Sequence, residues 1–314
     1  MRLVSLVCLS LFLTACAKSP DSRDELAVQG LFSGSFSADG TSALIASQLH
    51  GASYWSLSPL DRKYNWNHSD DGYTQITATA LSKDGLKAIT ATKNEWILWE
   101  TQSGKSLAFW QTPSDIFSVA LNNDGSRALL GLESGDVWYI NSATGNNELE
   151  FKHEEAVRSV AIDENSRLVL SGSDDYSAKF WSLDSGELVN TIPLKNMSRH
   201  VSFSKSGDIA FVSSLRNEHL LINTTDFSIK SSVQERYTVF NGAAFSPDES
   251  SVYLANQQGY IQAFNVHDGS EVARYKAERK SMFGAPRSVL SLWVDERSLL
   301  ALSSDGQLQT FSIR

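Results

Sequence analysis

Cysteine is scarce in this sequence, and its two copies, Cys8 and Cys16, both stand within the first 16 residues. Residues 17–314 therefore contain no thiol. Neither a disulfide nor a reactive cysteine can contribute to this part of the chain. Its stability must come from packing and from the way its ends are joined.

Long apolar runs are missing after the amino terminus, and none approaches the roughly 20 residues of a membrane-spanning helix. Positive charge is also in deficit, since 27 Lys and Arg face 36 Asp and Glu, a net charge of −9. An acidic surface repels nucleic acid and anionic lipid. We therefore expect no nucleic-acid partner, and no membrane contact through the protein surface itself.

Catalytic signatures are absent as well. No nucleophile elbow, Cys–His pair, zinc-ligand spacing or phosphate-binding glycine loop occurs. The segment Asn67–Tyr73 gathers His68, Asp70 and Asp71, three groups that are able to hold a cation. The spacing of an EF-hand is missing, however, which favours an ordinary loop. The sequence predicts a protein that is not an enzyme, with no catalytic residue, no cofactor and no metal.

The sequence does contain a repeated unit, which is clearest between His153 and Gly186. Three short apolar runs, Val157–Ile162, Arg167–Gly172 and Ser177–Ser182, are bounded by Asp, Asn, Ser or Gly, the pattern of β-strands. Glu187–Ile192 supplies a fourth strand. Four strands joined by tight turns form one antiparallel sheet, and such a sheet has two apolar faces to cover.

The same unit occurs seven times. Its first strand begins near residues 31, 76, 116, 157, 198, 240 and 289. A large apolar residue marks the third strand of each copy: Trp55, Trp99, Ile140, Trp181, Ile222, Phe264 and Phe311. Because these two sets of positions agree, the chain is predicted to stack seven similar sheets, each covering its neighbours.

The unit at His153 resembles a WD40 repeat, which builds one four-stranded blade of a β-propeller. In that family a hydrogen-bonded tetrad joins the strands, and His153, Ser171, Asp175 and Trp181 stand at its positions. The other copies depart from this set at one or more positions. The resemblance, which covers about residues 26–314, implies an all-β fold: a seven-bladed propeller of four-stranded antiparallel blades.

The seventh copy ends just after its third strand, at Phe311. A blade of three strands would expose an open edge, which sheets avoid. The apolar segment Glu25–Gly30 has no partner of its own in the repeat pattern. We therefore predict that this segment is the fourth strand of the last blade and that the propeller comprises residues 25–314.

The amino terminus has the form of a signal peptide, with Arg2 followed by an apolar stretch to Leu13. The sequence Leu-Thr-Ala-Cys that ends at Cys16 resembles the processing box of bacterial lipoproteins. That resemblance implies removal of residues 1–15 and lipidation of Cys16 with fatty acyl chains such as palmitate. The alternative is a plain secretory signal followed by a chance cysteine.

Residue Ala17, in place of Asp, implies transfer to the outer membrane in the lipoprotein family. Residues 16–24 would then be the lipidated cysteine and its tether, and the propeller would face the periplasm. A tether of residues 17–24 reaches at most about 27 Å.

The longest predicted connection between blades, Lys276–Arg287, is basic and carries two neighbouring apolar side chains. It lies on the face that holds the connections from fourth to first and from second to third strands, which we call the top face. Such a loop suits an acidic partner with an apolar slot. The alternative is an insertion whose apolar pair folds over the ring. The candidate partner-binding residues are Arg279, Lys280, Met282, Phe283 and Arg287.

Taken together, these features favour a non-enzymatic protein-interaction scaffold, lipid-anchored in the bacterial cell envelope. Its partner is expected to be an envelope or periplasmic protein that binds the top-face loops, and its identity stays open. Two alternatives remain at this point: a sensor that binds a small molecule or glycan through channel-lining aromatics, and a periplasmic propeller hydrolase or lyase. Fold class does not decide between them.

Overall fold

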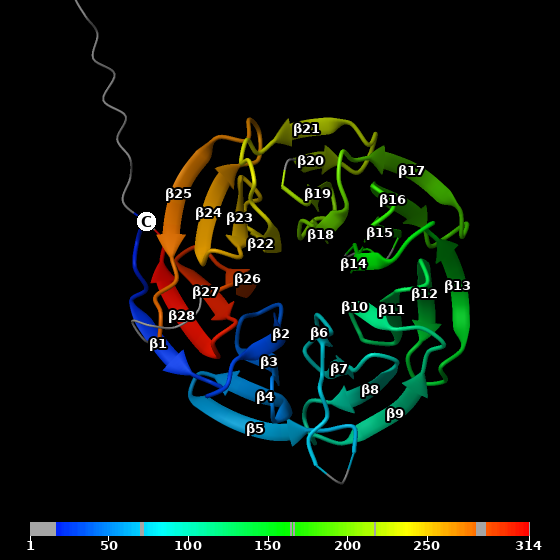
Figure 1. Cartoon of the computed structure of the whole chain (residues 1–314), viewed down its shortest axis with the longest axis vertical. Helices are drawn as coiled ribbons and strands as arrows, with labels where there is room; N and C mark the ends of the chain where they lie inside the picture. Colours follow the sequence, from blue (N-terminus) through cyan, green and yellow to red (C-terminus); the bar gives the residue numbers. More distant parts are fainter. Residues whose placement is uncertain are drawn as a thin grey trace, which may run out of the picture.

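The structure, a computed structural model, describes residues 17–69, 72–163, 165, 167–216, 218–280 and 287–313. Every regular element in these residues is a β-strand, and the strands β1 to β28 form seven four-stranded antiparallel sheets. Figure 1 shows the sheets arranged as blades around a central channel. The predicted seven-bladed propeller is confirmed. Within the described ranges no helix has the length and hydropathy needed to cross a membrane.

In blades 1 to 6 the strands follow in chain order from the channel outward. Blade 1 is β2 (Leu31–Phe36), β3 (Ser42–Ser47), β4 (Gly51–Leu57) and β5 (Leu60–Trp66). Blade 2 is β6 (Ala78–Leu81), β7 (Lys87–Ala91), β8 (Glu95–Glu100) and β9 (Ser106–Gln111). Blade 3 is β10 (Ile116–Leu121), β11 (Arg127–Leu132), β12 (Asp136–Asn141) and β13 (Asn147–Lys152). Blade 4 is β14 (Val157–Ile162), β15 (Leu168–Ser173), β16 (Ser177–Ser182) and β17 (Leu188–Pro193).

The last blades continue the series and end with a strand taken from the amino terminus. Blade 5 is β18 (Ser198–Phe203), β19 (Ile209–Ser214), β20 (His219–Asn223) and β21 (Ile229–Ser232). Blade 6 is β22 (Phe240–Phe245), β23 (Ser251–Asn256), β24 (Tyr260–Asn265) and β25 (Glu271–Lys276). Blade 7 is β26 (Val289–Val294), β27 (Ser298–Ser303), β28 (Gln307–Ser312) and β1 (Ser22–Glu25).

Burial along the strands explains their composition. Second strands such as β19 are buried at every position, so they appear as unbroken apolar or small-residue runs. Fourth strands such as β13 are mostly exposed and are rich in polar residues. The core lies between blades: Phe180 of blade 4 and Val212 of blade 5, for example, share one buried cluster. Each sheet therefore depends on its neighbours to cover its faces.

The ring is closed by β1, which pairs with β28 so that Arg23 lies opposite Gln309. The predicted closing strand, Glu25–Gly30, was placed too late in the sequence. Leu26, whose apolar side chain suggested a strand, instead begins a turn, and the N–H groups of residues 26 and 27 both donate to the Gly306 carbonyl, at 2.8 and 3.1 Å. An outer strand is solvated on one side, so the charged sequence of β1 suits this position better.

The residues just before β1 also lie on the propeller. Lys18 forms a parallel bridge with Tyr275, and its N–H donates to the Arg274 carbonyl at 2.9 Å. The N–H of Lys276 in turn donates to the Lys18 carbonyl at 2.8 Å. The N–H of Asp21 donates to Thr310 in blade 7 at 2.7 Å. We expected residues 17–24 to be a free tether, but this segment joins the outer strands of blades 6 and 7.

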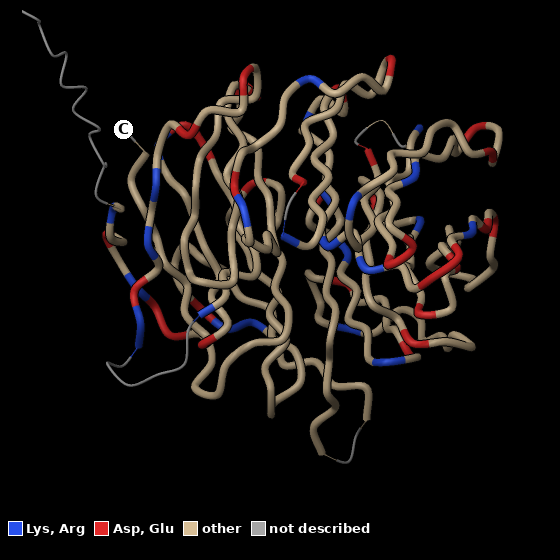
Figure 2. Tube along the Cα trace, turned by 45° about the horizontal axis from the view of Figure 1, so that its top comes forward, with Lys and Arg blue, Asp and Glu red and all other residues tan. Residues whose placement is uncertain are grey.

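The two faces of the ring differ in the loops they carry. The top face holds the connections between blades and the turns between second and third strands. The bottom face holds the turns between first and second strands and between third and fourth strands. Acidic and basic positions are interspersed around the ring (Figure 2).

Candidate functional site

A chain of side-chain hydrogen bonds fixes the top-face connection that leads into blade 4. His153 Nδ1 lies 2.8 Å from the Asp175 carboxylate, and Nε2 lies 2.7 Å from Ser171 Oγ. Trp181 Nε1 donates to the same Oγ at 2.8 Å. Burial lowers the pKa of His153 despite the opposing effect of Asp175, so the ring is neutral. A neutral ring that donates from Nδ1 and accepts at Nε2 satisfies every group in the chain.

Blade 2 repeats most of this arrangement. His68 Nε2 lies 2.8 Å from Thr90 Oγ1, and Trp99 Nε1 donates to that same oxygen at 2.8 Å. The side chain of His68 therefore points into the blade rather than toward a cation. Asp70 and Asp71, the other two residues of the candidate cation loop, lie outside the described residues. Where the structure describes the chain, no group of three His, Cys, Asp or Glu is placed to hold a metal.

The candidate loop on the top face begins with residues that are tied to the closing strand. Lys280 Nζ lies 2.9 Å from the Glu25 carboxylate and 3.3 Å from the Val28 carbonyl. Arg23 pairs with Glu278 at 3.1 Å and donates to the Arg279 carbonyl at 3.4 Å. These side chains are substantially exposed, so each pair contributes little energy alone. Together they fix the position of the loop's first residues and balance much of its charge.

Arg287, at the other end of this loop, is 5% exposed. Its Nε lies 3.0 Å from the Asp305 carboxylate, and Nη1 donates to the Glu278 carbonyl at 2.8 Å. This guanidinium links the two ends of the loop to the turn of blade 7 and is not presented to solvent. Met282 and Phe283 lie outside the described residues.

Charged groups at the top mouth of the channel are also paired with one another. Arg158 Nε lies 2.7 Å from the Asp174 carboxylate, and Arg199 approaches the same group at 3.9 Å. The Arg158 guanidinium also lies 4.2 Å from the centroid of the Phe117 ring. The Asp174 carboxylate is therefore already engaged by two guanidinium groups of the first strands of blades 4 and 5.

The bottom mouth of the channel holds a cavity of about 430 Å³, which we call the bottom cavity. Its wall combines the ends of the first strands of blades 4 to 7 with the turns that follow the first strands of blades 1, 2, 5, 6 and 7. Three half-buried aromatic side chains, Phe203, Phe245 and Trp293, form much of this wall. The remaining large apolar residues are Ile162, Leu292 and Val294, and two lysines, Lys83 and Lys205, complete the charged part of the lining with Asp295.

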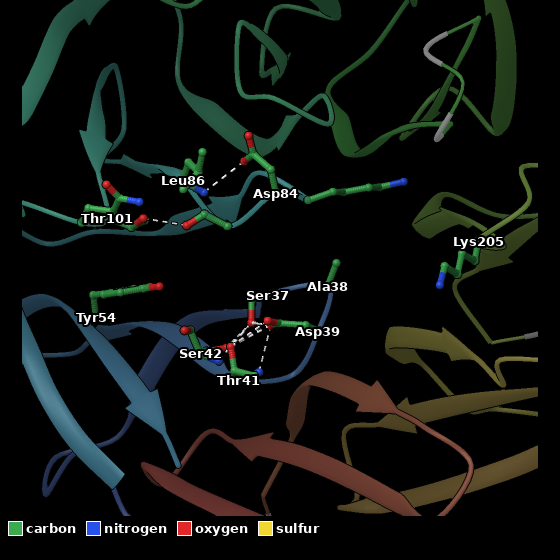
Figure 3. A pocket seen from close by; sticks show the side chains of 13 residues that line it. Ser37, Ala38, Asp39, Thr41, Ser42, Tyr54, Asp84, Leu86, Thr101 and Lys205 are labelled. Carbon is green, nitrogen blue, oxygen red and sulfur yellow. Dashed lines mark hydrogen bonds between the residues drawn. The ribbon is translucent and has the colours of Figure 1, made fainter. Parts of the chain in front are cut away.

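A second, polar depression of about 510 Å³ adjoins the bottom cavity between blades 1 and 2. The two share Ala38, Lys83 and Lys205. Figure 3 shows Asp39 and Thr41 on one side of this depression, Asp84 and Leu86 on the other, and Lys205 apart from both at the right edge. Asp39 accepts hydrogen bonds from Ser37 Oγ at 2.6 Å and from Thr41 Oγ1 at 2.8 Å, so its oxygens are used within its own turn.

Comparison with known proteins identifies the repeat. Residues 145–182, which include the tetrad around His153, match the family model described as WD domain, G-beta repeat. The matched segment is thus similar to a WD40 repeat. The match extends from the outer strand of blade 3 through the third strand of blade 4, so the WD40 unit spans two successive blades.

The curated relatives match this chain at low identity or over a small part of its length. Eukaryotic translation initiation factor 3 subunit I of Brugia malayi is 20% identical over 62% of this chain and 63% of its own length. The SAGA complex subunit Spt8 of Schizosaccharomyces pombe is 28% identical over 42% of this chain and 27% of its length. Pre-mRNA-processing factor 19 of the same yeast is 34% identical over 28% of this chain and 18% of its length. This chain thus spans less than two thirds of each.

The WD40 resemblance pointed to the top face, and the sequence reasoning missed the bottom cavity. A signal for it does exist in the repeat alignment. The first strands of blades 5 and 6 end in Phe203 and Phe245, and that of blade 7 ends in Trp293 and Val294. Bulky side chains at the same position of successive blades, here Phe203, Phe245 and Val294, meet at one end of the channel because the repeats are related by rotation about it. Trp293 stands one position earlier, so the repeat alignment does not place it with them.

Proposed function

We propose that this chain is a protein-interaction scaffold that is anchored in the bacterial cell envelope by a lipid on Cys16 and binds a partner protein through its top-face loops. WD40 propellers are typical of such scaffolds, and two of the relatives are named as subunits of larger assemblies. A rigid ring that presents loops suits this role because the loops can vary while the scaffold keeps its shape.

The observation that carries the proposal is the connection between β25 and β26. It is the longest connection between successive blades, from residue 277 to residue 288. Both of its ends are fixed by pairs to the rigid ring, through Lys280 with Glu25 and Arg287 with Asp305. The partner-binding groups are then Arg279 and Lys280 together with Met282 and Phe283. Because ion pairs offset much of the loop's charge, the apolar pair supplies most of the affinity.

Replacing Met282 and Phe283 together by Ser is expected to reduce partner capture at least about tenfold while leaving the melting temperature unchanged. Loss of two apolar contacts at an interface centre is sufficient for a decrease of this size. The measurement is crosslinking in intact cells followed by affinity purification and quantification of the co-purified protein. A matched control replaces Leu49 and Tyr237, which are 59% and 75% exposed, by Ser in the other loops of the same face.

The control variant should retain the partner. A large fall in melting temperature for the Met282→Ser/Phe283→Ser variant would show instead that the pair is folded over the ring. Full retention of the partner by that variant would refute the assignment of the loop.

The anchoring part of the proposal is constrained by the chain between Cys16 and the ring. The N–H and the carbonyl of Lys18 are both hydrogen-bonded to β25, so the distance from Cys16 to the ring is limited by the two residues that precede Lys18. Two residues span at most about 7 Å. The lipid would therefore hold the outer edge of blades 6 and 7 close to the bilayer, on the periplasmic side of the outer membrane. The longer reach expected from residues 17–24 does not apply.

Cys16→Ser is expected to move the protein from the membrane fraction to the soluble periplasmic fraction and to abolish incorporation of labelled palmitate. A variant in which Ala17 becomes Ser preserves the cysteine and serves as the control. If the wild-type chain carries no label, or if Cys16→Ser stays in the membrane fraction, the lipid anchor is refuted. The scaffold role would be unaffected by that result.

A further inference from the structure

The bottom cavity lies on the face opposite the proposed partner-binding loops. Its size, about 430 Å³, falls within the range of roughly 300–1,000 Å³ that is usual for small-molecule sites. Such sites combine an apolar wall with a few polar groups that fix the orientation of the ligand. The bottom cavity has both parts, the aromatic wall of blades 5 to 7 and the two lysines.

The aromatic wall is held in place from behind. Trp293 Nε1 donates to the Ala38 carbonyl at 2.9 Å, which joins blade 7 to the first turn of blade 1. A Cβ atom added at Gly40 would lie 2.4 Å from the indole ring, so the backbone there packs directly against Trp293. Phe203 packs edge-on against Phe180 of the core, with ring centroids 6.2 Å apart. A wall fixed in this way need not be ordered when a ligand binds.

The charged side chains that line the bottom cavity differ in whether they already have partners within the protein. The Asp295 carboxylate accepts the N–H groups of Arg297, at 2.7 Å, and of Ser298, at 2.5 Å, within its own turn. Lys205 is exposed and makes no ion pair or hydrogen bond with another residue in the described part of the chain. Lys83 lies at the same rim, half-buried. Among the described residues, the cavity therefore offers one cationic group without a partner, Lys205, beside an apolar wall.

We propose that the bottom cavity binds a small organic anion with an apolar body, such as a medium-chain or aryl carboxylate. The body packs against Phe203, Phe245 and Trp293, and the carboxylate pairs with Lys205, while Lys83 adds positive charge to the same lining. A cationic ligand of the same size would meet two lysines and a single carboxylate, Asp295, in the lining, so the net charge of the cavity disfavours it. This site is independent of the lipid on Cys16 and of the top-face loop.

The first test uses the full chain carrying Cys16→Ser, so that no attached acyl chain competes with the probe for the cavity. Binding of decanoate, kept below its aggregation concentration, is measured by isothermal titration calorimetry. Saturable binding at one molecule per chain is expected. Decyltrimethylammonium, which has the same body and the opposite charge, should bind at least about tenfold more weakly, because it meets lysines at the rim. Absence of saturable decanoate binding, or equal affinity for the two probes, would overturn the proposal.

The second test assigns the site. Lys205→Glu is expected to weaken decanoate binding at least about tenfold, since it replaces an attractive charge by a repulsive one. Lys230→Glu makes the same change in charge on the exposed outer strand β21 and should leave binding unchanged. Equal losses in both variants would indicate a general charge effect, and an unchanged affinity in Lys205→Glu would show that decanoate binds elsewhere. Either result refutes the site.

Discussion

A chain that lacks residues 18–25 is expected to melt about 10 °C or more below the full chain. The deletion removes β1 and with it the pairing partner of β28, including the four residue pairs from Ser22 to Glu25. It also removes the backbone hydrogen bonds of Lys18 to blade 6. At a net value of about 1 kcal/mol for each bond, roughly 5 kcal/mol of stability is lost. A loss of this size lowers the melting temperature of a large domain by about 10–20 °C.

A matched control separates the backbone pairing from the charges that accompany it. Arg23→Ala with Glu25→Ala removes two exposed ion pairs, to Glu278 and Lys280, and keeps the strand. Exposed pairs contribute at most about 1 kcal/mol each, so this variant should melt within a few degrees of the wild type. Thermal unfolding followed by circular dichroism measures both. If the deletion variant has the same melting temperature as the control variant, the pairing of β1 with β28 does not stabilise the ring.

Acidification is expected to destabilise the protein strongly between pH 6.5 and 4. Burial lowers the pKa of His68, His200 and His219 to about 4 each, from an unfolded value of 6.5. Because the folded-state pKa is the lower one, the unfolded chain binds more protons in this window. Stability is therefore complete above pH 6.5 and is lost as the pH falls toward 4. Each histidine contributes up to about 3 kcal/mol.

Melting temperatures at pH 7.5 and pH 4.5 test this prediction, and a fall of at least about 10 °C is expected. His219→Gln removes one contributing group, whose Nδ1 lies 2.9 Å from Ser213 Oγ, and should reduce the fall by about a third whatever its effect at pH 7.5. His267→Gln changes an exposed histidine and should leave the fall unchanged. A flat profile, or equal effects of the two variants, would contradict the assignment.

The seven copies and the tetrad residues could be predicted from the sequence because each depends on the residue pattern within a single repeat. A strand of alternating or unbroken apolar residues between turn-forming residues is visible in a single repeat, and recurrence at residues such as Trp99 and Trp181 fixes the register. The tetrad positions of His153 and Ser171 carried over because one copy kept all of them. The hydrogen bond between their side chains in the structure follows from that spacing.

The exact closing strand was harder to predict, because outer strands need little hydrophobicity. The apolar Leu26 drew the prediction to Glu25–Gly30, whereas the strand is the charged segment Ser22–Glu25. In the same way, nothing in the sequence distinguishes Arg287, which is buried against Asp305, from Arg279 in the same loop. Burial of a charge depends on a partner supplied by a distant turn, and a local pattern does not contain that partner.

The amino-acid sequence alone determined the number of blades, the number of strands in each blade and the fact that an amino-terminal strand completes the ring. These features follow from periodicity, which each repeat carries within itself. Only the tertiary structure decided which residues form that strand, that Lys18 joins blades 6 and 7, and that Phe203, Phe245 and Trp293 meet at the bottom of the channel. The reason is that these contacts join separate blades, and their geometry exists only once the ring has closed.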